Sequence, residues 1–469
     1  MNNITDLLRK WLDSQSTGSS PLYLVGGTVR DLLSNNFPKD IDLVCKNAKE
    51  LASNIAGRKN AALVPMEKKP DEPCYRIVNR QTPDNFLDIA EMRGGTIYED
   101  LNHRDFTINA VAIKINQDCS LGEIIDPLNG AGDITKKIIR IINNKSIVSD
   151  PLRILRAIRF SAMPNFSTEH TTSEEIGRSA HLLKDVSSER IMGELCLILK
   201  SPGSSRFFRQ MDDLGILDII FPEIGPMKGC PQNGFHHKDV WEHSLLVMES
   251  CEEIINNSSK YFKDASAGAA ENLAGNDRLP LLKLAALLHD AGKPATRGLN
   301  PDTGRITFYG HDEEGAKLIS LIAERLKMSS RSRDFMVLMA AEHLHILHLA
   351  SKAVKSATKM KWFRRMGDDS VPAIILSMAD GMGILGPDAT EEYRERHIRW
   401  SVESIGDYYK EIKAKIESPD LLTGHDLIAL GMQPGPEIGR ILAQVRDALD
   451  SGEIADREDS IEMAKTLIV

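Results

Sequence analysis

The sequence predicts an α+β head followed by three all-helical parts. Between residues 21 and about 142, short aliphatic and β-branched runs alternate with helical stretches, which is typical of a mixed α/β domain. After Asp150 the strand patterns give way to long stretches with a 3.6-residue apolar period, which indicate amphipathic helices. The 469 residues are enough for roughly three or four domains. We place the boundaries at 1–148, 149–228, 229–415 and 416–469.

Composition and charge exclude several classes of protein. A content of 42% hydrophobic and 27% charged residues excludes wholesale disorder. We find no apolar run of about 18 residues and no apolar signal region, so we expect a cytoplasmic protein without membrane contact. The six cysteines contain no CxxC pair, which fits reduced thiols in that compartment. Because the net charge is −9, a nucleic-acid partner requires local basic surfaces.

The head is predicted to begin with an amphipathic helix within residues 1–20, followed by alternating strands and helices. AKELASNIAG (48–57) is a predicted helix. The predicted strands are LYLV (22–25), IDLV (41–44), YRIV (75–78), FLDIA (86–90), NAVAIKI (109–115) and IRIIN (139–143).

Two features of the first strands indicate phosphate chemistry. Gly26 and Gly27 join the first predicted strand to a predicted helix, and glycines there let backbone N–H groups approach a phosphate. On an ideal strand Asp40 and Asp42 share one face, about 6.6 Å apart along the chain. Two such carboxylates can bridge metal ions roughly 3.5–4 Å apart. With Arg30 just upstream, this pattern favours a metal site over two solvent-facing aspartates on an edge strand.

Six segments resemble, in order, the signatures of class II tRNA nucleotidyltransferases and bacterial poly(A) polymerases, within the polymerase-β-like superfamily. The resemblance implies a polymerase-β-like head, an all-α neck, an HD-type body and a helical tail. The segments are GGTVRD (26–31), DID (40–42), HRDFTINAVAI (103–113), IIDPLNGAGDI (124–134), SDPLRILRAIRF (149–160) and SSERIMGEL (187–195).

The family's reaction is nucleotidyl transfer, in which an RNA 3′-hydroxyl attacks the α-phosphate of a nucleoside triphosphate with the help of two Mg²⁺ ions. The resemblance implies that Asp40 and Asp42 bind the metal, and Asp88 is a weaker candidate for a third carboxylate. The implied nucleotide-binding residues of the head are Gly26, Gly27 and Arg30 for the triphosphate, Arg104 and Asp105 for phosphate and ribose, and Asn109 in support. The family often has arginine where His103 stands.

The segment 149–160 is predicted to be a helix that begins with Asp150 as its N-cap. Arg153, Arg156 and Arg159 recur every three residues and span about 120° of one face, which suggests an anionic ligand. The resemblance implies that Asp150 and Arg153 hydrogen-bond the Watson–Crick edge of the incoming base. Ser149 stands where the family usually has an acidic residue.

The length of one connection bears on the subtype. Only ten residues, 94–103, separate Arg93 from Arg104, whereas CCA-adding relatives usually carry a longer flexible loop here. A short connection leaves little chain to reorganise a nucleotide pocket. This resembles the CC-adding subtype, so the expected partners are tRNA and CTP, and the oligomeric state is left open. The rival readings within the family are CCA addition, which also takes ATP, A addition and poly(A) synthesis.

The helical half carries a second set of candidate ligands. His243, His289, Asp290 and Asp380 resemble the ligand set of HD-domain phosphohydrolases, which suits a divalent transition metal or Mg²⁺. His311 and His343 complete a second site or contact phosphate in this reading. Four other histidines are expected to be solvated or core residues: His236, His237, His345 and His348.

The residues support three further interpretations. The basic stretch 351–367 either stacks RNA on Trp362 and Phe363 or is a solvated helix face with two buried aromatic residues. The polar segment 264–278 is predicted to be a solvated loop. The rivals from other classes are a phosphohydrolase whose head only binds RNA and a non-catalytic RNA-binding protein, and the intact Asp40, Asp42 and Arg30 argue against both.

Overall fold

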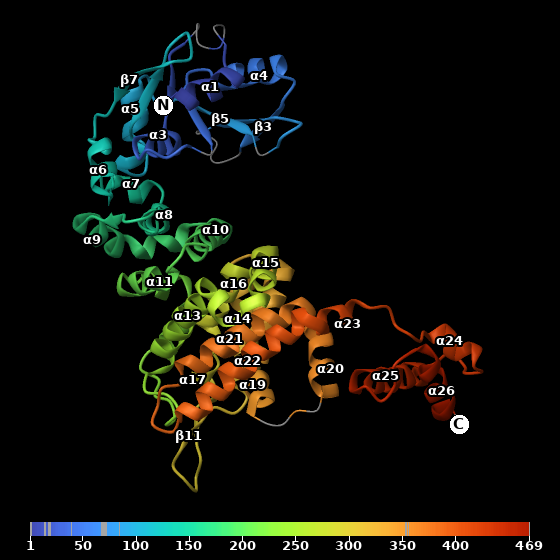
Figure 1. Cartoon of the computed structure of the whole chain (residues 1–469). Coiled ribbons are helices and arrows are strands. Elements are labelled where there is room, and N and C mark those ends of the chain that lie inside the picture. The colour runs from blue at the N-terminus through green and yellow to red at the C-terminus, as the bar shows by residue number, and fades with distance from the viewer. Residues whose placement is uncertain are drawn as a thin grey trace. The chain divides into compact units, whose positions relative to one another are not determined.

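The computed structural model describes residues 2–13, 16, 20–38, 40–66, 73–83, 85–351, 354 and 356–468. The chain forms two compact units, one of residues 1–194 with 213–219 and the other of residues 195–212 with 220–469. The first unit contains a large β-sheet and the second is mainly helical, so the predicted α+β class is confirmed (Figure 1). The finer division into four domains stays a prediction.

The head is built on a seven-stranded sheet with the order β3-β4-β5-β2-β1-β6-β7. Only β2 and β5 pair in parallel; the other neighbours are antiparallel. The strands are β1 (Leu22–Leu24), β2 (Ile41–Cys45), β3 (Ala62–Met66), β4 (Cys74–Val78), β5 (Phe86–Glu91), β6 (Ala112–Ile115) and β7 (Leu121–Ile125). The predicted strand at 139–143 is wrong in extent, because β8 (Ile138–Ile139) is only two residues long and pairs with β9 (Ser167–Thr168) outside this sheet.

Alternation along the strands gives each face of the sheet its own core. One face packs against α1 (Asn2–Trp11) and α4 (Ala48–Arg58) through residues such as Leu8 and Ile55. The other face packs against α5 (Ile97–Asn102) through Ile97 and Leu101. The remaining helices of the head are α3 (Gly26–Leu33), the 3-10 helix η1 (Thr107–Asn109) and α6 (Gly130–Lys136).

The neck continues the first unit with short helices. They are α7 (Lys145–Ser149), α8 (Arg153–Ser161), α9 (His170–Ser179), the 3-10 helix η2 (Ala180–Asp185), and α10 (Ser188–Leu199), which runs into the second unit. Asp150 is the C-cap of α7, and α8 begins only at Arg153. The expectation that Asp150 is the N-cap of the arginine-bearing helix is therefore wrong. The backbone between the two helices turns at residues 150–152.

The second unit is an assembly of helices. α12 (Ile216–Ile220) belongs almost entirely to the first unit. The helices of the second unit are α11 (Ser204–Asp213), α13 (Val240–Asn256), α14 (Ser258–Phe262), α15 (Ser266–Ala274), α16 (Arg278–Leu288), α17 (Lys293–Thr296), α18 (His311–Arg325), α19 (Ser330–Ser351), α20 (Ser356–Met366), α21 (Ser370–Gly383), α22 (Glu391–Asp407), α23 (Lys413–Glu417), α24 (Gly424–Ala429), α25 (Pro436–Ser451) and α26 (Arg457–Ile468). The loop predicted at 264–278 is wrong. This alanine-rich stretch forms α15, which buries Ala269 and Leu273, four residues apart on one face.

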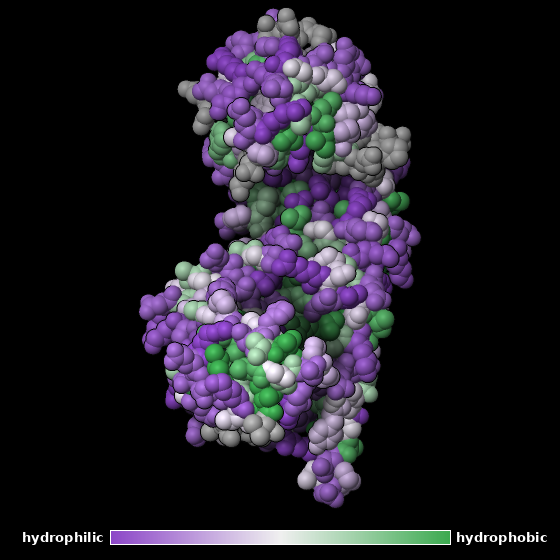
Figure 2. Space-filling view, turned by 90° about the vertical axis from the view of Figure 1, so that its right-hand side faces the viewer, coloured by the Kyte–Doolittle hydropathy of each residue, from purple (hydrophilic) through white to green (hydrophobic). Residues whose placement is uncertain are grey.

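Figure 2 shows a face that is mostly hydrophilic, with hydrophobic residues in separate patches. Within the described part of the chain, no helix is long and apolar enough to cross a membrane.

Candidate active site and candidate metal centre

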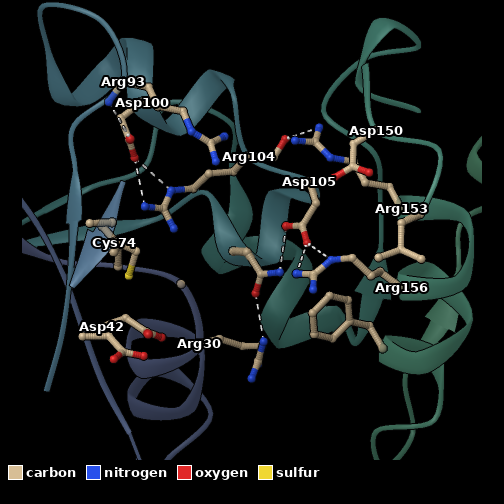
Figure 3. A pocket seen from close by; sticks show the side chains of 18 of the residues that line it. Arg30, Asp42, Cys74, Arg93, Asp100, Arg104, Asp105, Asp150, Arg153 and Arg156 are labelled. Atoms are coloured by element: carbon tan, nitrogen blue, oxygen red, sulfur yellow. Dashed lines mark hydrogen bonds and ion pairs between the residues drawn. The ribbon is translucent and has the colours of Figure 1, made fainter. Parts of the chain in front are cut away.

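A cavity of about 660 Å³ lies in the first unit, where the sheet of the head meets the neck. Figure 3 shows Arg30 and Asp42 on the head and Asp150, Arg153 and Arg156 on the neck. Every residue predicted to bind metal or nucleotide in this half lines the cavity, except Asp40. These lining residues are Gly26, Gly27, Arg30, Asp42, Arg104, Asp105, Asn109, Asp150, Arg153, Arg156 and Arg159.

The glycine pair at the start of α3 allows a close approach of the backbone to charged side chains. Gly26 has φ +61°, in the left-handed region that favours glycine. A Cβ added at Gly26 would lie 3.3 Å from Arg104 Nη1, and one added at Gly27 would lie 3.3 Å from Asp42 Oδ2. Larger residues here would crowd the carboxylate of Asp42, so the pair helps to keep that side of the cavity open.

Two carboxylates lie side by side on the floor of the cavity. Asp42 and Asp88 are register partners on the parallel strands β2 and β5, so they occupy the same face of the sheet. Arg76 on β4 donates two hydrogen bonds of 2.8 Å to the carboxylate of Asp88. Carboxylate oxygens are the ligands that Mg²⁺ prefers in proteins, so Asp42 and its neighbour fit a magnesium site.

Asp40 takes a different position from the one expected. It is exposed and lies one residue before β2, so only Asp42 belongs to the strand. Thr28 fixes this segment: its hydroxyl donates to the carbonyl oxygen of Asp40 (3.0 Å) and accepts from the amide of Asp42 (2.7 Å). The hydrogen bond with Asp88 raises the pKa of Arg76, and the negative charges of Asp88 and Asp40 raise it further. Asp40 therefore interacts electrostatically with the arginine that binds Asp88.

A chain of hydrogen bonds joins the head to the neck. Arg30 Nη1 donates to Asn109 Oδ1 (2.9 Å), and Asn109 Nδ2 donates to Asp105 Oδ1 (2.9 Å). From the neck, Arg156 Nε and Nη2 donate to Asp105 Oδ2 at 2.9 and 2.5 Å. Burial alone raises the pKa of Asp105, but the charge of Arg156 and these hydrogen bonds outweigh it and lower the pKa to about 2. Asp105 is therefore an ionised, buried link between α8 and Asn109, which in turn accepts from Arg30.

Arg156 and Arg159 of α8, with Arg30 of α3, surround an aromatic ring that sequence reasoning missed. The guanidinium carbons of Arg30, Arg156 and Arg159 lie 5.3, 5.3 and 4.3 Å from the centre of the Phe160 ring. Glu194 accepts a hydrogen bond of 2.7 Å from Arg159 Nε and lies 3.6 Å from Arg156. These contacts hold three cations of like charge beside one another at the cavity.

The two residues predicted to read the base have protein partners in this structure. Arg190 Nη2 donates to both carboxylate oxygens of Asp150 at 3.0 Å. Arg153 donates to the backbone carbonyls of His103 (2.8 Å) and Arg104 (2.9 Å), and it is 9% exposed. Arg190 was not predicted, because its partner lies 40 residues away in the sequence.

The segment between Arg93 and Arg104 is a short, capped helix. Thr96 and Glu99 form a capping box at the start of α5. Backbone N–H groups of Gly95 and Thr96 lower the pKa of the Glu99 carboxylate. At the other end, Arg104 Nε and Nη2 donate to Asp100 Oδ2 at 3.0 and 2.9 Å. These contacts hold the ten-residue connection at both ends.

The second unit brings the predicted metal ligands together in one buried cluster. His243 Nε2 lies 3.0 Å from Asp380 Oδ1, and His289 Nε2 lies 3.2 Å from Asp290 Oδ2. His311 and His343, the two additional candidates, face the other oxygen of Asp290. All six residues are at most 6% exposed. They come from α13, α18, α19 and α21 and from the residues that follow α16.

Backbone carbonyls orient three of these imidazoles. The Nδ1 atoms of His289, His311 and His343 lie 2.8, 2.7 and 2.6 Å from the carbonyl oxygens of Ala286, Phe308 and Ala340. A ring that donates through Nδ1 presents the Nε2 lone pair to a metal, as is usual for metal-binding histidines. The donor set and its orientation therefore fit a divalent metal ion.

Lys293 is a further residue of this cluster that sequence reasoning missed. Its Nζ lies 2.6 Å from Asp290 Oδ2 and donates to Gln232 Oε1 at 2.7 Å. The spacing of three residues after Asp290 in LLHDAGK was an available signal. His236 packs edge-to-face against His243 with ring centres 4.4 Å apart, while His237, His345 and His348 are exposed. These four agree with the expected solvated or core roles.

The basic stretch 351–367 does not present aromatic rings to RNA. Trp362 is 3% and Phe363 0% exposed, and Trp362 Nε1 donates to Glu342 at 3.0 Å. Arg364 and Arg365 pair with Asp450 and Glu342. The stacking reading is wrong and the alternative, a solvated face with two buried aromatic residues, is confirmed. Lys352 and Lys355 lie outside the described residues.

Three family models match the chain in succession. Residues 22–140 match the poly A polymerase head domain. Residues 165–227 match the domain described as "Probable RNA and SrmB- binding site of polymerase A". Residues 240–382 match the HD domain, which contains all six clustered ligands.

Similar proteins cover nearly the whole chain. An A-adding tRNA nucleotidyltransferase from Deinococcus radiodurans is 29% identical over 443 residues, which is 93% of each protein. A CC-adding tRNA nucleotidyltransferase from Thermus thermophilus is 28% identical over 93% of this chain and 92% of its own length. In fold, the chain is similar to the Thermotoga maritima CCA-adding enzyme complexed with tRNA, with a TM-score of 0.65, 24% identity and coverage of 100% and 96%.

Proposed function

Because this chain belongs to the tRNA nucleotidyltransferase and bacterial poly(A) polymerase family, we propose that it adds nucleotides to the 3′ end of tRNA without a template. The observation that carries the proposal is the cavity that Asp42 lines together with seven arginines from the head and the neck. Carboxylates for a metal and arginines for phosphates are the groups that phosphoryl transfer needs.

In the proposed reaction the 3′-hydroxyl of the RNA attacks the α-phosphate of a nucleoside triphosphate, and pyrophosphate leaves. Asp40 and Asp42, with Asp88 beside them, are the residues that would hold Mg²⁺ in a two-metal site. Bound Mg²⁺ lowers the pKa of an attacking hydroxyl and neutralises the leaving phosphates. Arg30, in the last turn of α3, and Arg156 and Arg159 of α8 bind the triphosphate through charge-assisted hydrogen bonds.

Base selection is assigned to Asp150 and Arg153, which line the cavity on the neck side. In this structure Asp150 contacts Arg190, and Arg153 contacts the backbone carbonyls of residues 103 and 104. To hydrogen-bond the polar edge of an incoming base, the two side chains must give up these partners. A base of the wrong kind would leave buried polar groups unpaired, at a cost of about 1–3 kcal/mol for each group.

We propose that the chain adds CC and stops before the terminal adenosine. CTP and ATP present different donor and acceptor edges, so accepting both requires the pocket to rearrange. The short, capped α5 leaves no long loop to drive that change. The relatives from Deinococcus radiodurans and Thermus thermophilus have almost the same identity to this chain but different printed specificities, so overall identity does not choose between A and CC addition.

The test uses three tRNA substrates, ending at the discriminator base, at C and at CC, each incubated with CTP or ATP alone. We expect CTP to extend the first two and ATP to be added poorly to the third. Rapid ATP addition to the CC-ending tRNA would contradict the CC assignment and leave the nucleotidyltransferase proposal intact. No extension of any substrate would contradict both.

We propose a second function for the HD cluster, the metal-dependent hydrolysis of a phosphoester. The observation that favours it is the burial of the whole ligand set around Asp290. Imidazole and carboxylate ligands suit Mn²⁺, Fe²⁺, Ni²⁺, Zn²⁺ or Mg²⁺. His243, His289, Asp290 and Asp380 would hold the ion, which when bound generates a hydroxide nucleophile from water near neutral pH.

A further inference from the structure

A row of three charged side chains crosses neighbouring strands of the head sheet. Asp42 on β2 is the register partner of Asp88 on β5, and Asp88 is the register partner of Arg76 on β4. Register partners point to the same face, and neighbouring strands lie about 4.8 Å apart. From this row we propose that Arg76 withholds Asp88 from metal binding, so that the head binds Mg²⁺ only weakly until a nucleotide is present.

The Arg76 guanidinium is fixed from two sides. Its Nε and Nη2 each donate a hydrogen bond of 2.8 Å to a different oxygen of Asp88, the bidentate geometry in which a guanidinium fork matches a carboxylate. The guanidinium carbon also lies 3.8 Å from the centre of the Phe86 ring, within cation–π range. Phe86 and Asp88 are two residues apart on β5, so they share a face of the sheet. Both oxygens of Asp88 therefore have a charged partner that is itself held in place.

Arg76 acts on the cavity through Asp88. Among the described residues, Asp42 and Asp88 line the cavity and Arg76 does not. Arg76 is therefore a positioning residue, which is not placed to touch the nucleotide. Its positive charge compensates Asp88 and repels an incoming divalent cation. An ion that bound Asp88 would have to displace the guanidinium and leave it without its partner.

This inference rests on the proposed nucleotidyl transfer and concerns how its metal is held. In proteins, Mg²⁺ is usually bound by one or two carboxylates together with phosphates of the substrate. With Asp88 compensated, the ion is left to Asp42 and the predicted ligand Asp40. The remaining oxygens must come from the triphosphate and from water. We expect the head to take up Mg²⁺ with the nucleotide rather than before it.

The test is Mn²⁺ binding by the full chain after chelator treatment, in the absence of nucleotide and tRNA. A His289→Ala background disables the histidine cluster of the second unit, and free Mn²⁺ is measured by electron paramagnetic resonance. Binding that an added Asp42→Asn removes is assigned to the head. We expect Arg76→Met to bind Mn²⁺ about tenfold more tightly than the background protein, because metal affinity rises with the number of charged ligands.

A second variant combines Arg76→Met with Asp88→Asn and removes the pair as a whole. Because the two charges cancel, the double variant should bind Mn²⁺ with the affinity of the background protein. Arg80→Met, at an exposed arginine two residues after β4, is the matched control and should leave the affinity unchanged. Circular dichroism shows whether each variant is folded, and Arg76→Gln decides the matter if Arg76→Met is not.

Unchanged affinity in folded Arg76→Met, or no Asp42-dependent binding in it, would overturn the role of Arg76. A double variant that binds Mn²⁺ much more weakly than the background protein would show that Asp88 is itself a metal ligand, and would overturn the inference as well. The proposed function is measured separately, as CTP incorporation into tRNA by the unmodified chain. Incorporation alongside either of these results would leave that function intact, and its absence would overturn it.

Discussion

Asp42 is the carboxylate that the strand β2 presents to the cavity, and its replacement tests the head most directly. We expect Asp42→Asn to lower CTP incorporation more than tenfold, because the metal that it would hold supplies several kcal/mol of transition-state stabilisation. Folding should be unaffected. The measurement is single-turnover extension of tRNA, with Asp6→Asn on α1, a carboxylate 69% exposed, as the control. A rate above about a tenth of the original would contradict the metal assignment.

Phe160 is expected to position the three arginines that surround its ring. Each cation–π contact contributes about 0.5–2 kcal/mol, so Phe160→Leu should raise KM for CTP by roughly tenfold with a smaller effect on kcat. The control is Phe166→Leu, because Phe166 lies outside the cavity lining and faces a single cation, Lys137. Steady-state kinetics with saturating tRNA measure both variants. An unchanged KM in a folded Phe160→Leu would show that the ring only fills space.

Asp105 should make the stability of the head–neck junction depend on pH. Its pKa is about 2 in the folded chain, below the ordinary 3.8, so its ionised form stabilises the fold above about pH 4. That contribution, about 2 kcal/mol, is lost as the pH falls from about 4 to about 2. We therefore expect hydrogen exchange in α8 to be faster in Asp105→Asn than in the unmodified protein at pH 5, and the difference between the two exchange rates to be smaller at pH 2.5. An equal difference in exchange rate at both pH values would contradict the assignment.

For single residues, the motifs predicted which side chains surround the cavity but not which of them contact one another. Asp105, Asn109 and the α8 arginines were identified by their order in the sequence. Their partners Arg190 and Phe160 were not, because a side-chain contact between distant segments leaves no periodic signal. Asp40 lies one residue before the start of β2, so the period of two along the strand does not by itself fix its face, and its role as a metal ligand stays a prediction.

Among the helices, α20 offers a test of whether its aromatic residues serve RNA or the core. Trp362 is buried and bonded to Glu342, so Trp362→Ala should lower stability by about 3–5 kcal/mol. At a temperature where it is folded, the variant should bind tRNA as well as the original does. Thermal unfolding and filter binding measure the two quantities. Lys361→Ala, at an exposed neighbouring position, should leave stability unchanged.

A loss of tRNA affinity in folded Trp362→Ala, without a loss of stability, would restore the RNA-stacking reading.

Where both neighbours of a strand are strands of the sheet, the sequence predicted a strand, although the one predicted at 109–115 begins only at Ala112 because Asn109 ends the 3-10 helix η1. The missed ones, β3 and β7, are the two edges, where pairing is one-sided and the apolar pattern is weak. β3 contains Pro65 and exposes Val64, and β7 contains Gly122. The segment that forms α15 was predicted to be a loop because its alanines are interspersed with Asp, Asn and Glu. Alanine is nevertheless the best helix former.

For the whole molecule, the two compact units predict separable activities. His289→Ala should remove the transition metal that we expect the purified protein to contain, because His289 belongs to both groups of side chains that could hold a metal ion. Nucleotide addition should survive, since the cavity is lined entirely by the first unit. Metal analysis and tRNA extension on the same preparations measure both. Equal metal content in the variant and the original would contradict the HD assignment.

The order of head, neck and helical body was predictable because periodicity changes from two to 3.6 near residue 150. The cluster of six ligands was predictable only as a set of resembling motifs. Its geometry depends on helices that start as far apart as residues 240 and 370, and no spacing rule specifies how they pack. The same holds for Lys293, whose role emerges only from its distance to Asp290.

The parallel pairing of β2 with β5 has a consequence for how related sequences can vary in length. Asp42 and Asp88 face the cavity together only in the present register, and one residue inserted within β5 would turn Asp88 to the opposite face. An insertion in the connection between residues 78 and 86 leaves that register intact. Natural variants of this protein should therefore gain and lose residues in that turn, and keep the lengths of β2 and β5 constant.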